Sequence, residues 1–195
     1  MKAYYEARAR EYDDWWLGGK LYSSRHRPGW DEEVDALCGV VAALPPARTL
    51  DVACGTGFLT RHLRGDVVGL DQSPSMIDVA REQAPNAELV VGDALSLPFG
   101  DQSFDRVFTG HFYGHLEDAE RNRFLAEARR VGRELVVVDS ARNDETPAEQ
   151  MDPRVLSDGS EWEVYKRWLT AEELTSELGS VEILHTGRYF IAAQA

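Results

Sequence analysis

Three aspartates stand where acidic side chains could bind one ligand together. Asp51 precedes a glycine-rich turn, and Asp71 and Asp93 stand at the ends of short apolar runs. A carboxylate can accept hydrogen bonds from both hydroxyls of a ribose, or from an exocyclic purine amine. Asp51 would repel a pyrophosphate but suits a ligand with an ammonium or sulfonium cation. Each aspartate alone could be a cap or a solvated strand end, so the prediction depends on all three.

The glycine-rich turn contains Gly55 and Gly57, where we expect a strand to end and a helix to begin. Glycines there let the backbone approach a ligand closely, at the positive end of a helix. The dinucleotide fingerprint requires a third glycine where this chain has Thr60, and the Gly-Lys-Ser/Thr run of a P-loop is missing. Both differences argue against a nicotinamide-dependent oxidoreductase and against a P-loop protein.

Valine- and leucine-rich runs alternate with helical patterns along most of the chain. The run Leu135–Val138 is apolar on both faces, as in a strand covered by helices on both sides. Strand–helix alternation with short connections predicts an α/β fold with parallel strands. The predicted strands are 48–53, 66–71, 88–91, 104–109 and 134–139, and the predicted helices are 58–64, 74–84 and 117–131.

The two ends of the chain and one internal segment depart from this alternation. A capping box at Thr170 and Glu173 predicts a helix over 170–178. The short turn Thr186-Gly187 then joins two predicted strands, 181–185 and 188–193, which must pair antiparallel. Residues 1–44 read as helical, whereas 141–160 is polar and reads as a loop.

Three segments resemble the first three motifs of the class I S-adenosylmethionine-dependent methyltransferases of the small-molecule type: 50–57, 68–77 and 91–99. The segments 104–108 and 135–139 are similar to the family's fourth and fifth strands. The resemblance covers residues 48–140 well and the C-terminal strands loosely. It implies a Rossmann-like, doubly wound α/β/α fold whose seven-stranded sheet is mostly parallel with the last strand antiparallel.

The resemblance also implies S-adenosylmethionine as cofactor and S-adenosylhomocysteine as product. Asp71 would hold the ribose, Met76 would pack on the adenine, and Asp93 with the Ala94 amide would bind the adenine edge. Ala53 replaces the first glycine of the family pattern, which we expect to be tolerated. The expected cofactor-binding residues are Tyr12, Asp51, Ala53, Cys54, Gly55, Gly57, Asp71, Gln72, Met76, Asp93 and Ala94.

The loop after the fourth predicted strand holds the candidate catalytic residues His111, Tyr113 and His115. A histidine titrates near neutrality and could accept a proton from the methyl acceptor. The alternative is that a histidine at this place packs beside the cofactor without acting as a base. Asp139 could bind a substrate amine, and Arg167 could bind an acidic substrate or lie on the surface.

Charge and cysteine content limit the partners. The net charge of −13, from 21 basic and 34 acidic residues, argues against nucleic acid and against an anionic membrane surface. Lys20, Arg25 and Arg27 could form a local basic patch, although solvated surface is the simpler interpretation. Cys38 and Cys54 have no metal-site spacing, and the N-terminus lacks an apolar leader. We expect a cytoplasmic monomer or homodimer without a metal.

The sequence therefore predicts methyl transfer to an oxygen or nitrogen of a small molecule. A protein or RNA methyltransferase and a non-catalytic cofactor-binding module remain as alternatives. Aromatic residues including Tyr12 and Trp16 form one face of the N-terminal helix, which either packs internally or covers a partly apolar acceptor. We expect a single domain with a helical cap (1–44), a cofactor-binding core (45–140), a substrate-side insertion (141–168) and a C-terminal helix with hairpin (169–195).

Overall fold

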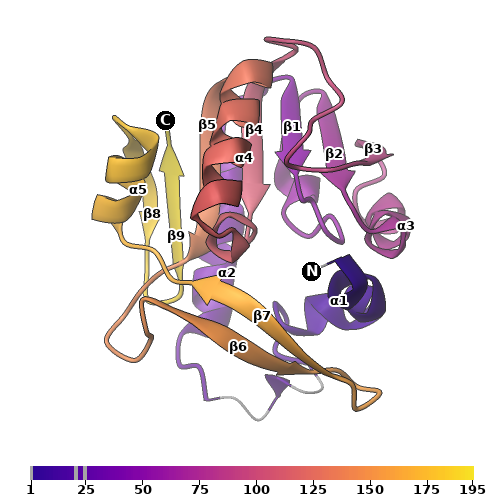
Figure 1. Cartoon of the computed structure of the whole chain (residues 1–195), viewed down its shortest axis with the longest axis vertical. Helices are drawn as coiled ribbons and strands as arrows, with labels where there is room; N and C mark the ends of the chain where they lie inside the picture. Colours follow the sequence, from indigo (N-terminus) through magenta and orange to yellow (C-terminus); the bar gives the residue numbers. More distant parts are fainter. Residues whose placement is uncertain (1, 20–21, 24–25) are drawn as a thin grey trace.

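The computed structural model describes residues 2–19, 22–23 and 26–195, and Figure 1 shows their arrangement. The strands are β1 (Thr49–Val52), β2 (Val67–Asp71), β3 (Glu88–Val91), β4 (Phe104–Gly110), β5 (Gly132–Ser140), β6 (Glu149–Val155), β7 (Glu161–Arg167), β8 (Glu182–Thr186) and β9 (Phe190–Gln194). The α-helices are α1 (Lys2–Arg8), α2 (Trp30–Ala43), α3 (Pro74–Gln83), α4 (Asp118–Val131) and α5 (Ala171–Leu178). Short 3₁₀ helices are η1 (Ala9–Asp14), η3 (Thr60–His62) and η4 (Tyr113–His115).

Seven strands form the main sheet in the order β3-β2-β1-β4-β5-β9-β8. The first five strands along the chain pair in parallel, whereas β9 runs antiparallel to β5 and to β8. This arrangement confirms the predicted Rossmann-like sheet with its last strand reversed. It also brings the carboxyl ends of β1 to β5 to one edge, the lower edge in Figure 1.

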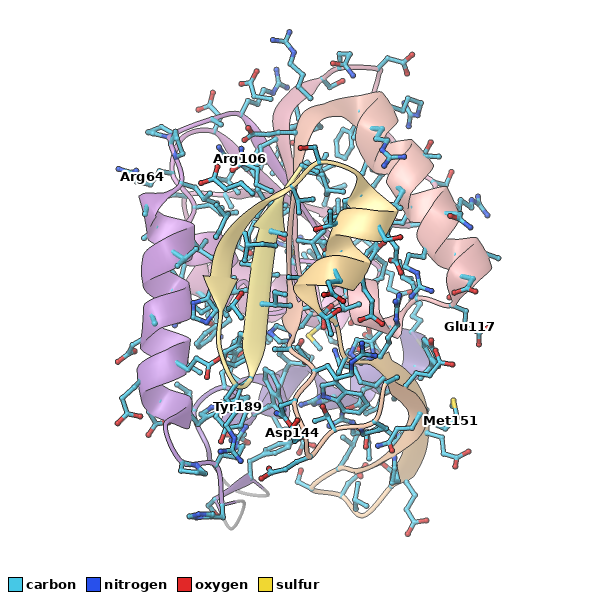
Figure 2. The ribbon with its side chains drawn as sticks, turned by 90° about the vertical axis from the view of Figure 1, so that its left-hand side faces the viewer. Arg64, Arg106, Glu117, Asp144, Met151 and Tyr189 are labelled. Atoms are coloured by element: carbon cyan, nitrogen blue, oxygen red, sulfur yellow. The ribbon has the colours of Figure 1, made fainter. Side chains whose placement is uncertain are left out.

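Helices cover both faces of this sheet, so its central strands are buried. Figure 2 shows the sheet nearly edge-on, with α2 on one face and α4 and α5 on the other. Val136 and Val138 of β5 pack into the cluster that contains α2, whereas Val137 packs into the cluster on the opposite face. Because neighbouring side chains of a strand point to opposite faces, this packing explains the continuous apolar run.

The predicted capping box of α5 is present, and α3 also begins with a side-chain cap. The Ser73 hydroxyl accepts a hydrogen bond from the Met76 amide at 3.2 Å, with Pro74 at the first turn of α3. Thr170 and Glu173 form the reciprocal capping box of α5. These capping residues determine where α3 and α5 begin.

Two local predictions were wrong. Residues 58–64 form only the short η3, in a segment that Gly57 and Gly65, both at positive φ, bound on either side. Residues 149–167 form the β6–β7 hairpin where a loop was expected over 141–160. Every residue of β6 is exposed or half-buried, so this strand lacks the alternating apolar pattern by which strands are recognised.

The hairpin and the N-terminal segment lie together beyond the carboxyl edge of the main sheet (Figure 1). Tyr4 of α1 packs with Leu156 and Val164 of the hairpin in a small separate cluster. The predicted helical N-terminus is divided into α1, η1 and α2, with turns in the described part between η1 and α2. No helix within the described ranges is long and apolar enough to cross a bilayer.

Candidate active site

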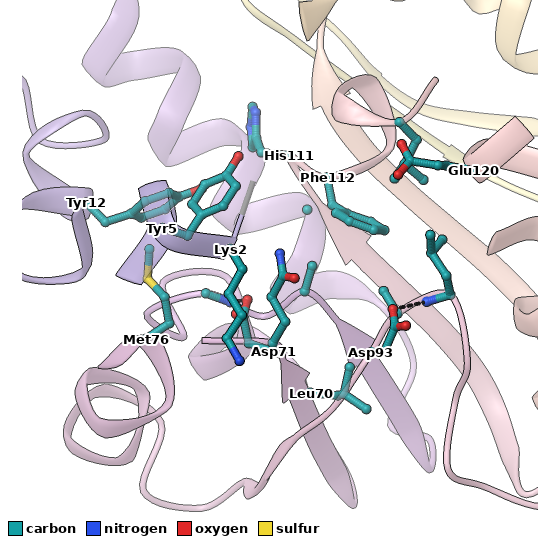
Figure 3. A pocket seen from close by; sticks show the side chains of 17 residues that line it. Lys2, Tyr5, Tyr12, Leu70, Asp71, Met76, Asp93, His111, Phe112 and Glu120 are labelled. Atoms are coloured by element: carbon teal, nitrogen blue, oxygen red, sulfur yellow. Dashed lines mark hydrogen bonds between the residues drawn. The ribbon is translucent and has the colours of Figure 1, made fainter. Parts of the chain in front are cut away.

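A cavity of about 360 Å³ lies at the carboxyl ends of β1 to β4, and we call it the strand-end pocket. Figure 3 shows Asp71 and Asp93 along one side of it, away from His111. Many of the predicted cofactor residues line this pocket: Tyr12, Ala53, Gly55, Asp71, Gln72, Met76, Asp93 and Ala94. It is also lined by Lys2, Tyr5, Leu70, Leu95, Gly110, Phe112, Leu116 and Glu120.

Asp71 is held rigidly at the floor of the strand-end pocket. One carboxylate oxygen accepts a hydrogen bond from the Gly55 amide at 3.1 Å, and the other from the Ser73 amide at 2.8 Å. Burial raises the pKa of Asp71, and the hydrogen bonds from these amides oppose that rise. Each oxygen has a second lone pair, so this carboxylate can still accept from a pair of ligand hydroxyls.

Asp93 and Met76 complete the polar and apolar sides of the same pocket. Asp93 accepts a hydrogen bond from the Leu95 amide at 2.8 Å and remains exposed (Figure 3). Met76 is fully buried, and its thioether side chain suits contact with a flat aromatic ligand. A ligand with a ribose and a purine amine therefore fits this set of groups.

Three predicted cofactor residues lie outside the strand-end pocket. Asp51 and Cys54 line only a neighbouring recess of about 20 Å³, and Gly57 lines neither cavity. Asp51 is buried and accepts a hydrogen bond from the Thr60 hydroxyl at 2.7 Å, while burial raises its pKa to about 7. At Gly57, a Cβ would lie 3.3 to 3.4 Å from Ala80 of α3 and from Ala84 directly after α3. Gly57 thus serves helix packing.

Ala53 adopts a left-handed backbone conformation with φ of 59°. Such a conformation costs an alanine about 1–2 kcal/mol, and glycine avoids this cost. The substitution of glycine by alanine at this turn is therefore accommodated with backbone strain, at a residue that lines the strand-end pocket.

The N-terminal segment is tied to the loops around the strand-end pocket. The Glu6 carboxylate accepts hydrogen bonds from the hydroxyls of Ser73 and Ser75, both at 2.5 Å. Asp13 accepts from the Thr56 hydroxyl at 2.6 Å. These contacts place the tyrosines of α1 and η1 against the pocket.

A second cavity, of about 240 Å³, shares Tyr5, Tyr12 and His111 with the strand-end pocket. We call it the cationic pocket because basic residues from three separate segments line it. Its aromatic walls are Trp15, Trp30, Trp168 and Tyr189, and its charged residues are Arg8, Arg27, Asp152, Arg154 and Lys166.

His111 stands at the junction of the two pockets in a left-handed conformation, with φ of 56°. Its Nδ1 lies 3.5 Å from the Ser140 hydroxyl and 3.9 Å from an Asp139 oxygen. Its buried Nε2 has no hydrogen-bond partner in the described part of the chain. Burial lowers the pKa of His111 to about 3 although Asp139 opposes this, so the ring is neutral at pH 7.

His115 lines only the cationic pocket, and Tyr113 lines neither pocket. Nδ1 of His115 lies 2.7 Å from the Tyr165 carbonyl oxygen, so Nδ1 carries the proton and Nε2 is an acceptor. Burial and Lys166 lower the pKa of His115 to about 3. Tyr113 is fully buried and donates to Glu177 at 2.6 Å, so it cannot reach a ligand in either pocket.

Asp139 and Arg167 are engaged by other side chains instead of facing a substrate. Asp139 is fully buried and accepts from Lys166 Nζ at 2.5 Å and from the Gly114 amide at 2.8 Å. Burial alone would raise the pKa of Asp139, but Lys166 and both histidines lower it to about 2. Arg167 pairs with Glu177 at 2.5 Å and with Glu173 at 3.4 Å. Neither residue lines the cationic pocket.

The sequence did not identify most of the basic residues that line the cationic pocket. Of the suggested basic patch, Arg27 does line this pocket, while Lys20 and Arg25 lie outside the described residues. Arg8 and Lys166 gave no spacing signal, although Lys166 stands two residues after Val164 on the inward face of β7. Among the described residues, no group of histidine, cysteine or acidic side chains could hold a metal ion.

Comparison with known proteins bears on this geometry. The family model "Methyltransferase domain" matches residues 50–135. A solved structure titled as a DhpI–SAH complex is 30% identical, has a TM-score of 0.71, and covers 98% of this chain and 92% of its own. The chain belongs to the class I S-adenosylmethionine-dependent methyltransferases. The family predicted from the three strand-end motifs is thereby confirmed.

Two further relatives show how much of the chain is similar to known proteins. A DhpI–SAM–HEP complex is 27% identical with a TM-score of 0.73, over 98% of this chain and 94% of that one. A demethylmenaquinone methyltransferase of Thermotoga maritima is 34% identical over 128 residues, which are 63% of this chain and 52% of the relative. The chain spans about half the length of the curated relatives it matches. The family model ends before the β6–β7 hairpin, so it covers little of the cationic pocket.

Proposed function

We propose that this methyltransferase-family chain is an active enzyme that binds S-adenosylmethionine in the strand-end pocket. It transfers the methyl group to an oxygen or nitrogen of a small molecule in the cationic pocket. The observation that carries this proposal is the set of three residues that line both pockets, Tyr5, Tyr12 and His111, which places the two cavities side by side. A donor and an acceptor in adjoining cavities meet the requirement that the reacting atoms be held in line.

Residues of the strand-end pocket would bind the cofactor through groups already in place. The Asp71 carboxylate accepts from the ribose hydroxyls, and Asp93 with the Ala94 amide binds the adenine edge. Met76 packs on the ring. Asp51 lies in the recess beside Ala53 and Gly55, where a cationic amino group would favour its ionised form. The cofactor supplies a methyl group already activated by its positively charged sulfur.

The protein must also orient the acceptor and allow the acceptor to lose its proton. The unpartnered Nε2 of His111 can accept a hydrogen bond from an acceptor hydroxyl or amine at the junction. With a pKa of about 3, the imidazole is a weak proton acceptor, and the same holds for His115. We therefore assign His111 to positioning the acceptor atom, with an acceptor that does not require strong-base catalysis.

The size of the cationic pocket supports a small acceptor over a protein or RNA. About 240 Å³ holds a small organic molecule, and aromatic side chains form several of its walls. The demethylmenaquinone methyltransferase among the relatives also acts, by its name, on a small molecule.

Calorimetric titration tests the cofactor half of the proposal. We expect S-adenosylmethionine and S-adenosylhomocysteine to bind and NADH not to bind. Asp71→Asn should weaken both adenosyl ligands by about tenfold or more, because it removes a charge-assisted acceptor. Asp66→Asn is the matched control, since Asp66 is exposed just before β2 begins, at the opposite end of the strand. Absence of adenosyl binding by folded protein would contradict the proposal.

Turnover separates an enzyme from a binding module. The protein is incubated with S-adenosylmethionine tritiated in its methyl group and a small-molecule extract, and label is counted in the fraction that passes a protein-retaining filter. Label in a new small-molecule product supports the proposal. Label found only on retained protein, or no transfer at all, would favour the other two interpretations.

A further inference from the structure

The cationic pocket has a charge opposite to that of the chain as a whole. The chain carries a net charge of −13, yet Arg8, Arg27, Arg154 and Lys166 line this one cavity with a single acid, Asp152. The two histidines in its wall are neutral near pH 7. A cavity of this kind attracts anions and excludes cations.

The basic residues differ in how far the protein neutralises them. Lys166 pairs with the buried Asp139, and Arg154 pairs with Asp152 at 2.5 Å. Arg8 has no carboxylate partner within the described ranges, although only 6% of its surface is exposed. A buried guanidinium without an anion is costly, because burial removes its hydration.

Tyrosines surround Arg8 but leave it charged. Its guanidinium donates to the hydroxyls of Tyr4 at 2.7 Å and Tyr22 at 3.0 Å. It also lies 4.7 Å from the ring centroid of Tyr12, which belongs to the wall between the two pockets. These neutral groups hold the guanidinium in place beside the acceptor space, with further N–H donors left for a ligand.

We infer that the acceptor is a small organic anion, and that its carboxylate or phosphate group binds Arg8 in the cationic pocket. This inference rests on the proposed function for its methyl-transfer part, but not for the anion site itself. Arg154 and Lys166 add positive charge from the hairpin, and Ser140, Asn143 and Thr146 add polar groups. Trp15 and Trp30 give the uncharged part of the molecule an aromatic wall. An anion bound here lies next to Tyr12 and therefore next to the bound cofactor.

Binding of simple probes tests the anion site without knowledge of the acceptor. Benzoate and inorganic phosphate are titrated in Tris buffer at low ionic strength, with benzamide as the uncharged match for benzoate. Tryptophan fluorescence and calorimetry report binding, since three tryptophans line the cavity. We expect at least one of the two anions to bind, and benzamide to bind about tenfold or more weakly than benzoate. The anion that binds better distinguishes a carboxylate from a phosphate ligand.

Variants locate the site. Arg8→Met should weaken anion binding by about tenfold or more, and Arg8→Lys should retain part of it, because a charged hydrogen bond is lost in the first and kept in the second. Arg10→Met, at an exposed position of the same segment, should bind like the parent protein. Denaturant unfolding is measured on each variant to show that the fold is kept. Arg154→Gln gives a second test from the hairpin.

The outcomes separate the inference from the proposed function. Failure of both anions to bind the parent protein at millimolar concentrations, or equal binding of benzoate and benzamide, overturns the inference even if the cofactor binds. Equal anion affinity in Arg8→Met and Arg10→Met also overturns it. Anion binding that depends on Arg8, in a protein that binds no adenosyl ligand, supports the anion site and contradicts the proposed function.

Discussion

The strand-end pocket and the cationic pocket share a wall but are built by different means. The strand-end pocket is lined mainly by residues that follow β1 to β4, so the order of the sheet brings them together. The cationic pocket is lined by the N-terminal segment, the β6–β7 hairpin and the loops after β4 and β5. The charged residues of the first are mainly acidic, Asp71, Asp93 and Glu120 with Lys2, whereas those of the second are mainly arginine and lysine.

This difference indicates which parts of the chain determine which half of the reaction. A sheet edge that is fixed by many strand pairings can hold one cofactor with little variation. The β6–β7 hairpin contributes residues to the cationic pocket alone, whereas Tyr5 and Tyr12 of the N-terminal segment line both pockets. On the proposed function, we therefore expect acceptor choice to depend most on the hairpin. Variants that affect one pocket and spare the other test this division directly.

The largest effect is expected at the ion pair beneath the cationic pocket. Lys166→Met leaves Asp139 buried and without its cation, which should lower the free energy of unfolding by about 3–5 kcal/mol. Denaturant unfolding measures the change. Combining Lys166→Met with Asp139→Asn removes the uncompensated charge and keeps an acceptor for the Gly114 amide, so stability should partly return. No recovery in the double variant would show that Lys166 acts through packing alone.

Acid sensitivity should also originate in the cationic pocket. His115 titrates near 6.5 when unfolded and near 3 when folded, because burial and Lys166 disfavour its charged form, against the attraction of Asp139. The unfolded chain therefore binds more protons between these values, and stability falls as pH is lowered. His115→Gln, whose amide can still donate to the Tyr165 carbonyl, should lose about 2 kcal/mol less stability than the parent protein when the pH is lowered from 6.5 to about 4.5.

Unfolding curves of both proteins across this pH range provide the measurement. Asp51 affects the pH dependence of stability in the opposite direction. Because burial raises its pKa to about 7, its contribution to the free energy of unfolding decreases as pH rises toward that value. That contribution is common to the parent and to His115→Gln, so the difference between them isolates His115. Identical pH dependence would show that the imidazole is solvated in the native state.

The same division explains how far the sequence could be interpreted. Asp71, Asp93 and the glycine-rich turn stand within a few residues of strand ends that valine-rich runs already predicted. Their position in space followed from the rule that parallel strands end at one edge. Arg8 lies in the N-terminal segment, far along the chain from Arg154 and Lys166 in the β6–β7 hairpin, and β6 has no alternating pattern. No spacing in the sequence predicts that these three side chains share a cavity.

Tyr12 lies in the wall between the pockets, so its loss should affect both. Tyr12→Ala should weaken S-adenosylhomocysteine and benzoate by about tenfold each, since it removes an aromatic wall and the ring beside Arg8. Trp16→Ala is the comparison: Trp16 stacks on Phe58 at 4.5 Å and lines neither pocket, only the recess beside Asp51, so this change should lower stability and leave benzoate affinity unchanged. Calorimetry on Tyr12→Ala that showed one affinity unchanged would assign the residue to a single pocket.

The smallest effect concerns the backbone of the strand-end pocket. Ala53→Gly should raise the free energy of unfolding by about 1 kcal/mol, because glycine adopts the left-handed conformation at φ of 59° without a Cβ clash. The matched control is Ala36→Gly at an exposed position inside α2, where the same change should cost about 1 kcal/mol. If denaturant unfolding shows that the free energy of unfolding rises in Ala53→Gly and falls in Ala36→Gly, Ala53 is strained. Equal destabilisation at both positions would mean that the turn fits alanine, and that the strand-end pocket stores no strain. Anion affinity should be unchanged in both variants, because neither residue lines the cationic pocket.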